Sequence, residues 1–231
     1  MNIGSRLEAI ANLILPDCVL ADIGTDHAYL PVYMLQQQKI RAAIAGDIAE
    51  GPCKAAENTV AMYGMKNRVQ VRLGSGLSVI KEDEADCISI AGMGGSTIVE
   101  ILSADLNIAR SAKRLVLQPQ TGAPGLRKWL LENAWDIIDE ELVFDNKRLY
   151  EIIVAEKAVV QKSYSPVELE VGPVLISKKH PLLTAQIVKI LETYSKQLGF
   201  MEKSTNAVQT QKYAYMRQMK QDLEALANDC Q

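Results

Sequence analysis

The sequence predicts an α/β protein with a mostly parallel sheet, followed by a pair of long helices. Two observations lead to this fold class. Over the first 160 residues, short apolar runs of strand length alternate with segments of helical periodicity, as in chains that form parallel sheets. After residue 161, apolar residues recur at spacings of three and four, which indicates helices that pack along a narrow seam.

Each predicted element follows from its own residues. The first helix, residues 5–15, has Ser5 as its predicted N-cap with Glu8 three residues later, and it ends before Pro16. The predicted strands span residues 18–23, 42–47, 69–73, 86–91, 114–119, 135–143 and 150–156. The helices predicted between them span residues 29–38, 52–62, 96–110 and 125–133. A short turn at residues 145–147 joins the last two strands, so we expect an antiparallel edge.

The carboxyl-terminal part is predicted to be a coiled-coil-like helical hairpin. Proline and glycine interrupt residues 163–179, which we interpret as a connection, and we expect the chain to reverse near Gly199. The apolar residues of the two expected seams are Leu183, Ile187, Ile190, Tyr194, Leu198, Met216, Met219, Leu223 and Leu226. We therefore expect two domains, residues 1–160 and residues 161–231.

Composition limits the function and the compartment. The net charge of −3 argues against a chain with a basic surface throughout, although the part after residue 161 holds more Lys and Arg than Asp and Glu. The four cysteines form no C-x-x-C pair, which argues against a zinc site or a disulfide framework. The sequence shows no signal-peptide pattern and no apolar run of about 18 residues. We expect a cytoplasmic protein with no metal and no membrane contact.

Polar or glycine-rich residues follow four of the predicted strands. In an open α/β sheet, ligands bind outside the carboxyl ends of the parallel strands, so these residues are expected to surround one crevice. They are Asp22, Gly24, Asp47, Ser75, Gly76, Gly92, Met93 and Gly94.

The loop after the first strand indicates the ligand. A dinucleotide site usually has three glycines there, because the backbone must approach a pyrophosphate closely. This loop has only Gly24 and adds the acid Asp26, which would repel a pyrophosphate. A cationic cofactor without phosphate, such as S-adenosyl-L-methionine (SAM), fits better. Asp47 lies near the spacing of about 20 residues at which an acid binds ribose hydroxyls, although it could instead cap a helix.

The motifs D-I-G-T-D-H-A-Y-L-P, I-A-G-M-G-G, L-Q-P-Q and L-Y-E-I-I resemble those of the TrmK family of bacterial tRNA (adenine-22-N1)-methyltransferases. The resemblance extends over nearly the whole chain. It implies a Rossmann-like SAM-dependent methyltransferase domain with a C-terminal coiled-coil hairpin, and methylation of N1 of adenine 22 in tRNA. The cofactor-binding residues that it implies are Asp22, Gly24, Asp47, Ile48, Ser75, Gly76, Gly92 and Met93.

The segment Gly92-Met93-Gly94 also bears on which nitrogen is methylated. It stands where N6-adenine methyltransferases carry an Asn/Asp-Pro-Pro-aromatic motif, and the absence of that motif argues against methylation of the exocyclic amine. Read alone, the same glycines could form a tight turn that needs positive φ angles.

Three residues of the first loop are candidates for catalysis. Adenine N1 carries a lone pair and needs no base, but its attack leaves a cationic ring, which Asp26 could stabilise. Tyr29 could stack on an extruded adenine, and His27 could contact the substrate or a phosphate. The alternatives are a helix N-cap for Asp26, core packing for Tyr29 and bracing of the loop for His27. Arg6 is a further candidate to face the crevice.

Other functions remain open from the residues alone: a SAM methyltransferase of another substrate, or a non-catalytic SAM- or RNA-binding module. The basic residues along the expected hairpin could contact tRNA phosphates or form a solvated helix face. They are Lys178, Lys179, Lys189, Lys196, Lys203, Lys212, Arg217 and Lys220. The helical seam would serve a dimer as readily as an intrachain hairpin, and we favour a monomer.

Overall fold

The structure, a computed structural model, describes residues 1–160, 162–204 and 206–229. The chain divides into two compact units, Met1–Lys162 and Ser163–Gln231. Among the described residues, no helix has both the length and the apolar character needed to cross a bilayer.

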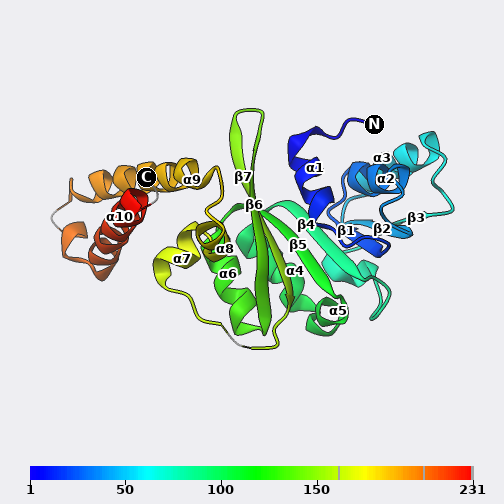
Figure 1. Cartoon of the computed structure of the whole chain (residues 1–231). Coiled ribbons are helices and arrows are strands. Elements are labelled where there is room, and N and C mark those ends of the chain that lie inside the picture. The colour runs from blue at the N-terminus through cyan, green and yellow to red at the C-terminus, as the bar shows by residue number, and fades with distance from the viewer. Residues whose placement is uncertain (161, 205, 230–231) are drawn as a thin grey trace. The chain divides into compact units, whose positions relative to one another are not determined.

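The described residues of the first unit fold around a seven-stranded sheet with the order β3-β2-β1-β4-β5-β7-β6 (Figure 1). The pairings from β3 to β5 are parallel, and β7 runs antiparallel to both β5 and β6, which confirms the predicted edge. The strands are β1 (Val19–Ile23), β2 (Ala42–Asp47), β3 (Val69–Leu73), β4 (Cys87–Gly94), β5 (Arg114–Thr121), β6 (Trp135–Asp145) and β7 (Arg148–Lys157).

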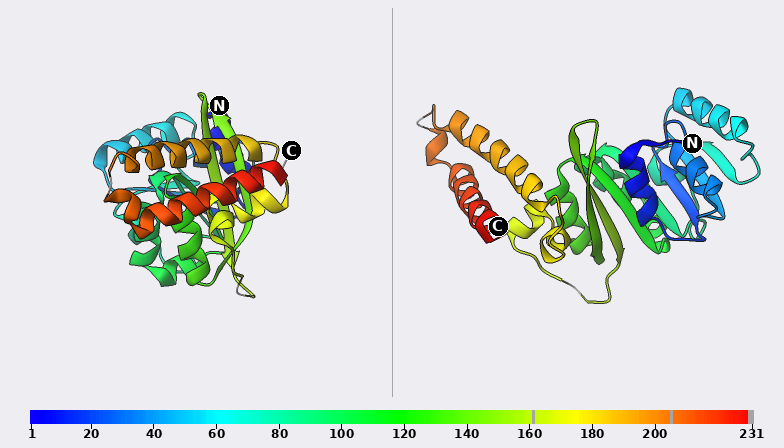
Figure 2. Two further views of the ribbon diagram at one scale, coloured as in Figure 1. Left: turned by 90° about the vertical axis from the view of Figure 1, so that its left-hand side faces the viewer. Right: turned by 45° about the horizontal axis from the view of Figure 1, so that its top comes forward.

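Helices pack on both faces of this sheet (Figure 2). They are α1 (Gly4–Leu13), α2 (Tyr29–Gln36), α3 (Glu50–Met62), α4 (Gly95–Ala104), α5 (Leu106–Ser111) and α6 (Ala123–Glu132), with a 3₁₀ turn, η1 (Gly76–Val79). Successive strand residues point to opposite faces, so Leu20 and Ala43 join the apolar cluster that contains Ile10 of α1, Leu35 of α2 and Val60 of α3. Each such aliphatic side chain larger than alanine contributes about 1.5–3 kcal/mol by its burial.

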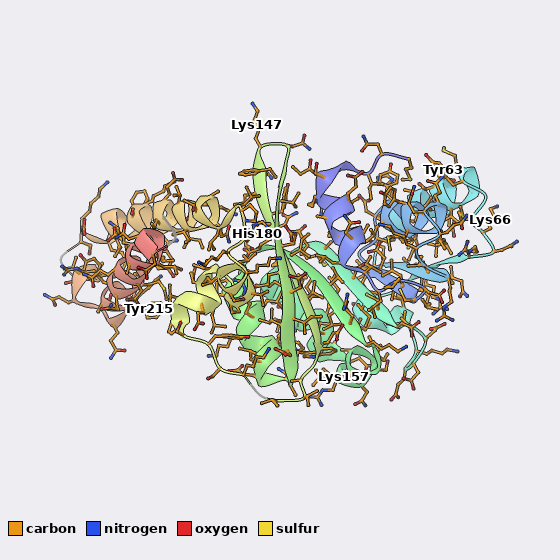
Figure 3. All side chains as sticks on the ribbon, viewed as in Figure 1. Tyr63, Lys66, Lys147, Lys157, His180 and Tyr215 are labelled. Carbon is orange, nitrogen blue, oxygen red and sulfur yellow. The ribbon has the colours of Figure 1, made fainter. Side chains whose placement is uncertain are left out.

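The hairpin between β6 and β7 closes through the predicted turn. Asp145 pairs with Arg148, and the two residues between them, Asn146 and Lys147, have φ angles of 46° and 64°. Two consecutive positive φ angles are those of a type I′ turn, whose twist matches that of the strands it joins. Lys147 projects from the tip of this hairpin (Figure 3).

Three predictions about local structure in this unit were wrong. Ser5 does not cap the first helix, which begins at Gly4, whose amide donates to Oδ1 of Asn2. The single helix expected over residues 96–110 is two helices, because the Asp105 side chain accepts from the Ile108 amide and starts α5. The segment expected to be a loop after β4 continues the strand through Gly94.

The second unit contains more helix than the sequence predicted. The expected connection over residues 163–179 holds α7 (Pro166–Val171), which begins with a capping box between Ser165 and Glu168, and α8 (Pro173–Ser177). The two long helices are α9 (Leu183–Met201) and α10 (Gln211–Asp229), and they pack against each other as a hairpin.

The reversal of this hairpin does not occur at Gly199, which lies inside α9. The chain turns after Met201, and a short 3₁₀ turn, η2 (Ala207–Gln209), precedes α10. The predicted seams are largely confirmed, since the buried apolar residues of the two helices include Leu183, Ile187, Leu198, Met216, Met219 and Leu223.

Candidate active site

The carboxyl ends of β1, β2, β3 and β4 lie along one edge of the sheet because these strands are parallel. The loop after β1 carries the most unusual backbone in this region. Gly24, Asp26 and Ala28 all have positive φ angles, of 74°, 53° and 54°. Non-glycine residues pay about 1–2 kcal/mol of strain in this conformation, and such residues concentrate at functional sites.

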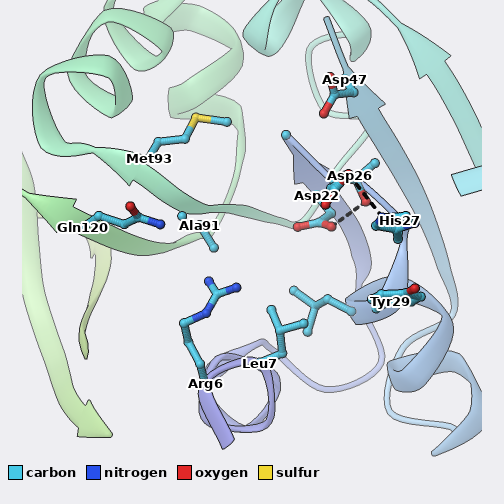
Figure 4. A pocket seen from close by; sticks show the side chains of 14 residues that line it. Arg6, Leu7, Asp22, Asp26, His27, Tyr29, Asp47, Ala91, Met93 and Gln120 are labelled. Atoms are coloured by element: carbon cyan, nitrogen blue, oxygen red, sulfur yellow. Dashed lines mark hydrogen bonds and ion pairs between the residues drawn. The ribbon is translucent and has the colours of Figure 1, made fainter. Parts of the chain in front are cut away.

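Two cavities open at this edge. The larger has a volume of about 480 Å³ and is lined by Asp22, Gly24, Asp26, His27, Tyr29, Asp47, Gly92 and Met93, together with Arg6 and Gln120 (Figure 4). The smaller, of about 340 Å³, is lined by Gly24, Asp47, Ile48, Ser75, Gly76, Met93 and Ile101. The residues that the sequence nominated for the site line one or both of the two cavities, except Gly94, which lines neither. Because the cavities share three residues, Gly24, Asp47 and Met93, we treat them as one crevice.

Asp22 is the buried acid of this crevice. It is 6% exposed, and its two carboxylate oxygens accept hydrogen bonds from Ser89 Oγ at 2.5 Å and from Thr25 Oγ1 at 2.7 Å. Burial raises the pKa of Asp22 above its ordinary value, while these two hydrogen bonds and the charge of Arg6 act in the opposite direction. The two hydroxyl groups orient the carboxylate and stabilise its ionised form.

Ser89 and Thr25 are functional candidates that sequence reasoning missed. Ser89 is fully buried in the apolar run Ile88-Ser89-Ile90. A hydroxyl in such a run needs a partner, and this requirement was the signal available in the sequence. It could not show that the partner is Asp22, which lies beside Ser89 only through the register of β1 and β4.

Asp26, His27 and Tyr29 form a cluster at the mouth of the larger cavity. The rings of His27 and Tyr29 stack with their centroids 5.0 Å apart and an angle of 8° between their planes. His27 Nε2 lies 3.6 Å from Oδ1 of Asp26. Tyr29 is 41% exposed, so core packing does not account for it. Asp26 is not the N-cap of α2, since that position belongs to Ala28.

Asp47 ends β2, and its Oδ1 accepts a hydrogen bond from the Ala49 amide at 2.9 Å. This contact turns the chain before α3, whose N-cap is Ala49, so Asp47 itself does not cap the helix. The contact holds the carboxylate at the point where the two cavities meet, beside Ile48, which is 71% exposed.

The crevice fits SAM in shape and in chemistry. Its volumes lie in the range of small-molecule sites. The φ angle of 74° at Gly24 favours glycine, and a Cβ there would also displace Cε of Met93, the end of a flexible side chain that lines both cavities. Carboxylates suit a ribose, an ammonium group and a sulfonium centre, and the apolar side chains of Ile48 and Ile101 suit an adenine ring.

A parallel sheet with acids at the ends of its first two strands, a single-glycine loop and a cavity of this kind define a SAM-dependent methyltransferase with a Rossmann-like fold. Residues 20–226 match the model of the family described as TrmK: tRNA (adenine(22)-N(1))-methyltransferase. The chain belongs to the TrmK family.

Individual relatives agree with this assignment. The tRNA (adenine(22)-N(1))-methyltransferase of Bacillus subtilis (strain 168) is 40% identical over 184 residues, which cover 78% of this chain and 77% of that protein. The structure of Streptococcus pneumoniae Sp1610 in complex with S-adenosyl-L-methionine superposes with a TM-score of 0.87 at 31% identity, covering 98% of this chain and 100% of that one. TrmK of M. capricolum in complex with S-adenosyl-homocysteine gives a TM-score of 0.84 at 26% identity, with 99% of each chain covered.

Proposed function

We propose that the crevice at the carboxyl edge of the sheet binds SAM and is where this chain methylates N1 of adenine 22 in tRNA. The observation that carries this proposal is the composition of the larger cavity. It brings the cofactor candidates Asp22, Gly24 and Met93 together with the substrate candidates Asp26 and Tyr29 in one space. A methyl donor and a base could therefore meet there.

The cofactor candidates divide between the two cavities. Asp47, where the cavities meet, would accept hydrogen bonds from the ribose hydroxyls. Ile48, Ser75 and Gly76 would contact the adenine ring in the smaller cavity. Asp22, in the larger cavity, would attract the cationic end of the cofactor, with Gly24 and Met93 lining the passage between them.

SAM supplies a methyl group bonded to a positively charged sulfur. The lone pair of adenine N1 forms the new N–C bond while the S–C bond breaks, and the electrons of that bond stay on sulfur. N1 of adenine has no proton to lose, so alignment of the two reactants contributes most of the acceleration. The positive charge passes to the adenine ring, and Asp26 would stabilise it electrostatically.

The stacked pair of His27 and Tyr29 would hold the target base. A stacked or paired adenine must leave its helix before N1 is accessible, and an aromatic surface at the cavity stabilises the extruded base. Such stacking contributes about 1–3 kcal/mol per base.

The remaining expectations belong to the same proposal. Because its substrate would be tRNA, we expect the protein to act in the cytoplasm. We also expect it to act as a monomer without a metal ion. The basic residues of the carboxyl-terminal hairpin would contact phosphates of the tRNA. Each phosphate that they neutralise would make the affinity for tRNA fall more steeply with salt concentration.

The test is transfer of labelled methyl groups from SAM to unmodified bacterial tRNA, followed by mass spectrometry of the nucleosides. The expected product is 1-methyladenosine, and tRNA in which guanine replaces adenine 22 should accept no label. Binding of SAM without labelling of any tRNA would direct the search to another substrate. Absence of SAM binding would leave a non-catalytic module as the better account.

A further inference from the structure

The motif L-Q-P-Q at the end of β5 contains two glutamines whose surroundings differ. Gln118 is fully buried, its Oε1 accepts a hydrogen bond from Arg6 Nη1 at 2.8 Å, and its Nε2 donates to the carbonyl oxygen of Pro119 at 3.0 Å. The amide of Gln118 is therefore used within the fold. Gln120 is exposed and lines the larger cavity. No residue that the structure describes forms a hydrogen bond with the Gln120 side chain, so both ends of its amide are available to a ligand.

A glycine beside Gln120 keeps the space next to its amide open. In the pairing of β4 with β5, the register shifts between Ala91 and Met93, at Gly92. Gly92 has a φ angle of 81°, which glycine adopts without strain, and a Cβ there would lie 3.7 Å from Nε2 of Gln120. Gly92 lines the larger cavity as well. A larger residue would place its side chain beside the amide, whereas glycine leaves that space to a ligand.

Gln120 lies across the cavity from the candidates for base binding. Figure 4 shows Gln120 on one side of this space and His27 and Tyr29 on the other, and all three residues line the same cavity. A flat base that enters between the two sides and contacts the Tyr29 ring would present one of its edges to Gln120. The side chain of Gln120 is thus placed to bind the edge of a base rather than its face.

The chemistry of a carboxamide identifies the base edge that fits. An amide offers one acceptor oxygen and a donor NH₂ group side by side. Adenine matches this pair at its N6 amine and N7, the Hoogsteen edge, and such a bidentate pair leaves N1 free. A pair with N6 and N1 would instead occupy the lone pair that must attack the methyl group. Guanine presents two acceptors, O6 and N7, and therefore cannot donate to the amide oxygen.

We propose that Gln120 recognises the Hoogsteen edge of the target adenine, accepting a hydrogen bond from N6 and donating one to N7. The pairing selects adenine and holds it with N1 available to the methyl donor. This inference rests on the proposed function, because it requires the target base in the larger cavity.

The test compares two tRNA substrates, one with adenine and one with 7-deazaadenine at position 22. Replacing N7 by a C–H group removes the acceptor for Gln120 and keeps N1 and the N6 amine. The readout is the preference of each enzyme, which is the ratio of kcat/KM for the two tRNAs. A difference in the intrinsic reactivity of N1 between the two bases is common to all variants, so it cancels when their preferences are compared.

We expect the wild-type preference for adenine to exceed that of Gln120→Leu by about 3–10-fold, the range of one neutral hydrogen bond. With the adenine-containing tRNA, Gln120→Leu should lose about 10–100-fold in kcat/KM, because both hydrogen bonds to the base are absent. Gln120→Glu accepts from N6 but has no proton to donate to N7, so it should lose the preference as well.

Gln37→Leu is the matched control, since Gln37 is an exposed glutamine at the end of α2 that lines neither cavity. It should keep the wild-type activity and preference. Calorimetry without tRNA should show unchanged SAM affinity in Gln120→Leu, and weaker SAM binding that accounts for the lost activity would assign the amide to the cofactor and overturn the inference. Equal preferences in the wild type and Gln120→Leu would overturn it as well. If the wild type transfers no methyl group to either tRNA, the proposed function itself fails.

Discussion

The hydroxyl of Ser89 donates a 2.5 Å hydrogen bond to Oδ1 of Asp22, joining the middle of β4 to the acid near the end of β1. The two residues are direct neighbours in the parallel pairing of these strands. A fully buried serine thus positions the carboxylate that we assign to the cationic end of SAM. This relationship leads to the first prediction.

Replacing Ser89 by alanine should weaken SAM binding and shift its pH dependence. Two effects raise the pKa of Asp22: its burial, which is the larger, and the charge of Asp47. The hydrogen bonds from Ser89 and Thr25 lower this pKa, and so does the charge of Arg6. Without the Ser89 hydroxyl the pKa rises further, so Asp22 becomes protonated at a higher pH. We expect about tenfold weaker binding near neutrality. Calorimetry between about pH 6 and pH 9 should show the loss of affinity on the acid side beginning at higher pH.

Ser103→Ala, on the exposed side of α4, is the control for this substitution and should leave both the affinity and its pH profile unchanged. A Ser89→Ala protein that folds normally and retains the wild-type pH profile would refute the positioning role.

Replacing Gly24 by alanine should abolish tight SAM binding. The added Cβ would overlap Cε of Met93, and the φ angle of 74° adds about 1–2 kcal/mol of strain for a non-glycine residue. We expect the affinity for SAM to fall more than tenfold. Adding Met93→Ala should recover part of that loss, because it removes the overlap but leaves the strain.

Gly51→Ala is the matched control, since nothing lies within 4 Å of its Cβ position. Equal behaviour of the two alanine variants would contradict the role that we assign to Gly24.

Replacing Tyr29 by alanine should impair transfer to tRNA without impairing SAM binding. The loss of about 1–3 kcal/mol of base stacking corresponds to a decrease of about 10–100-fold in kcat/KM for tRNA. Tyr29→Phe keeps the ring that stacks on His27 and should retain most of the activity. Kinetics with tRNA as the variable substrate provide the measurement, and full activity of Tyr29→Ala would exclude the stacking role.

Arg127 should be essential for stability although it lies outside the crevice. Its side chain is fully buried, with Nε 2.7 Å from Glu140 Oε1 and Nη2 2.7 Å from Glu151 Oε2. Arg127→Met removes the positive charge from between two carboxylates, so we expect the free energy of unfolding to fall by about 3–5 kcal/mol. Urea denaturation followed by circular dichroism measures this change.

Lys128→Met, at the neighbouring exposed position, should change the stability by less than about 0.5 kcal/mol. Replacing all three residues by apolar ones, as Arg127→Met with Glu140→Leu and Glu151→Leu, should recover much of the stability, because neither carboxylate then stays buried without the arginine. Similar losses for Lys128→Met and Arg127→Met would show that the buried charges are not the cause.

The sequence by itself was sufficient for the order of strands and helices along the sheet domain and for the residues at the strand ends. These features depend on local periodicity, on turn residues and on the rule that parallel strands present their carboxyl ends at one edge. The resemblance to the TrmK family added the methylated atom. Local signals failed where neighbouring residues compete, as at Ser5, Asp105 and Gly199.

Only the tertiary structure decided which side chains meet. Ser89 reaches Asp22 across 67 positions of sequence, and Arg6 reaches Gln118 across 112. No periodicity encodes such pairs, because they depend on the register between strands and on where α1 packs against the sheet. The strained loop from Gly24 to Ala28 also depends on the tertiary structure, since its positive φ angles persist only where the surrounding fold supports them. The sequence thus determined which residues come to the crevice, and the packing of the whole sheet determined how they are oriented within it.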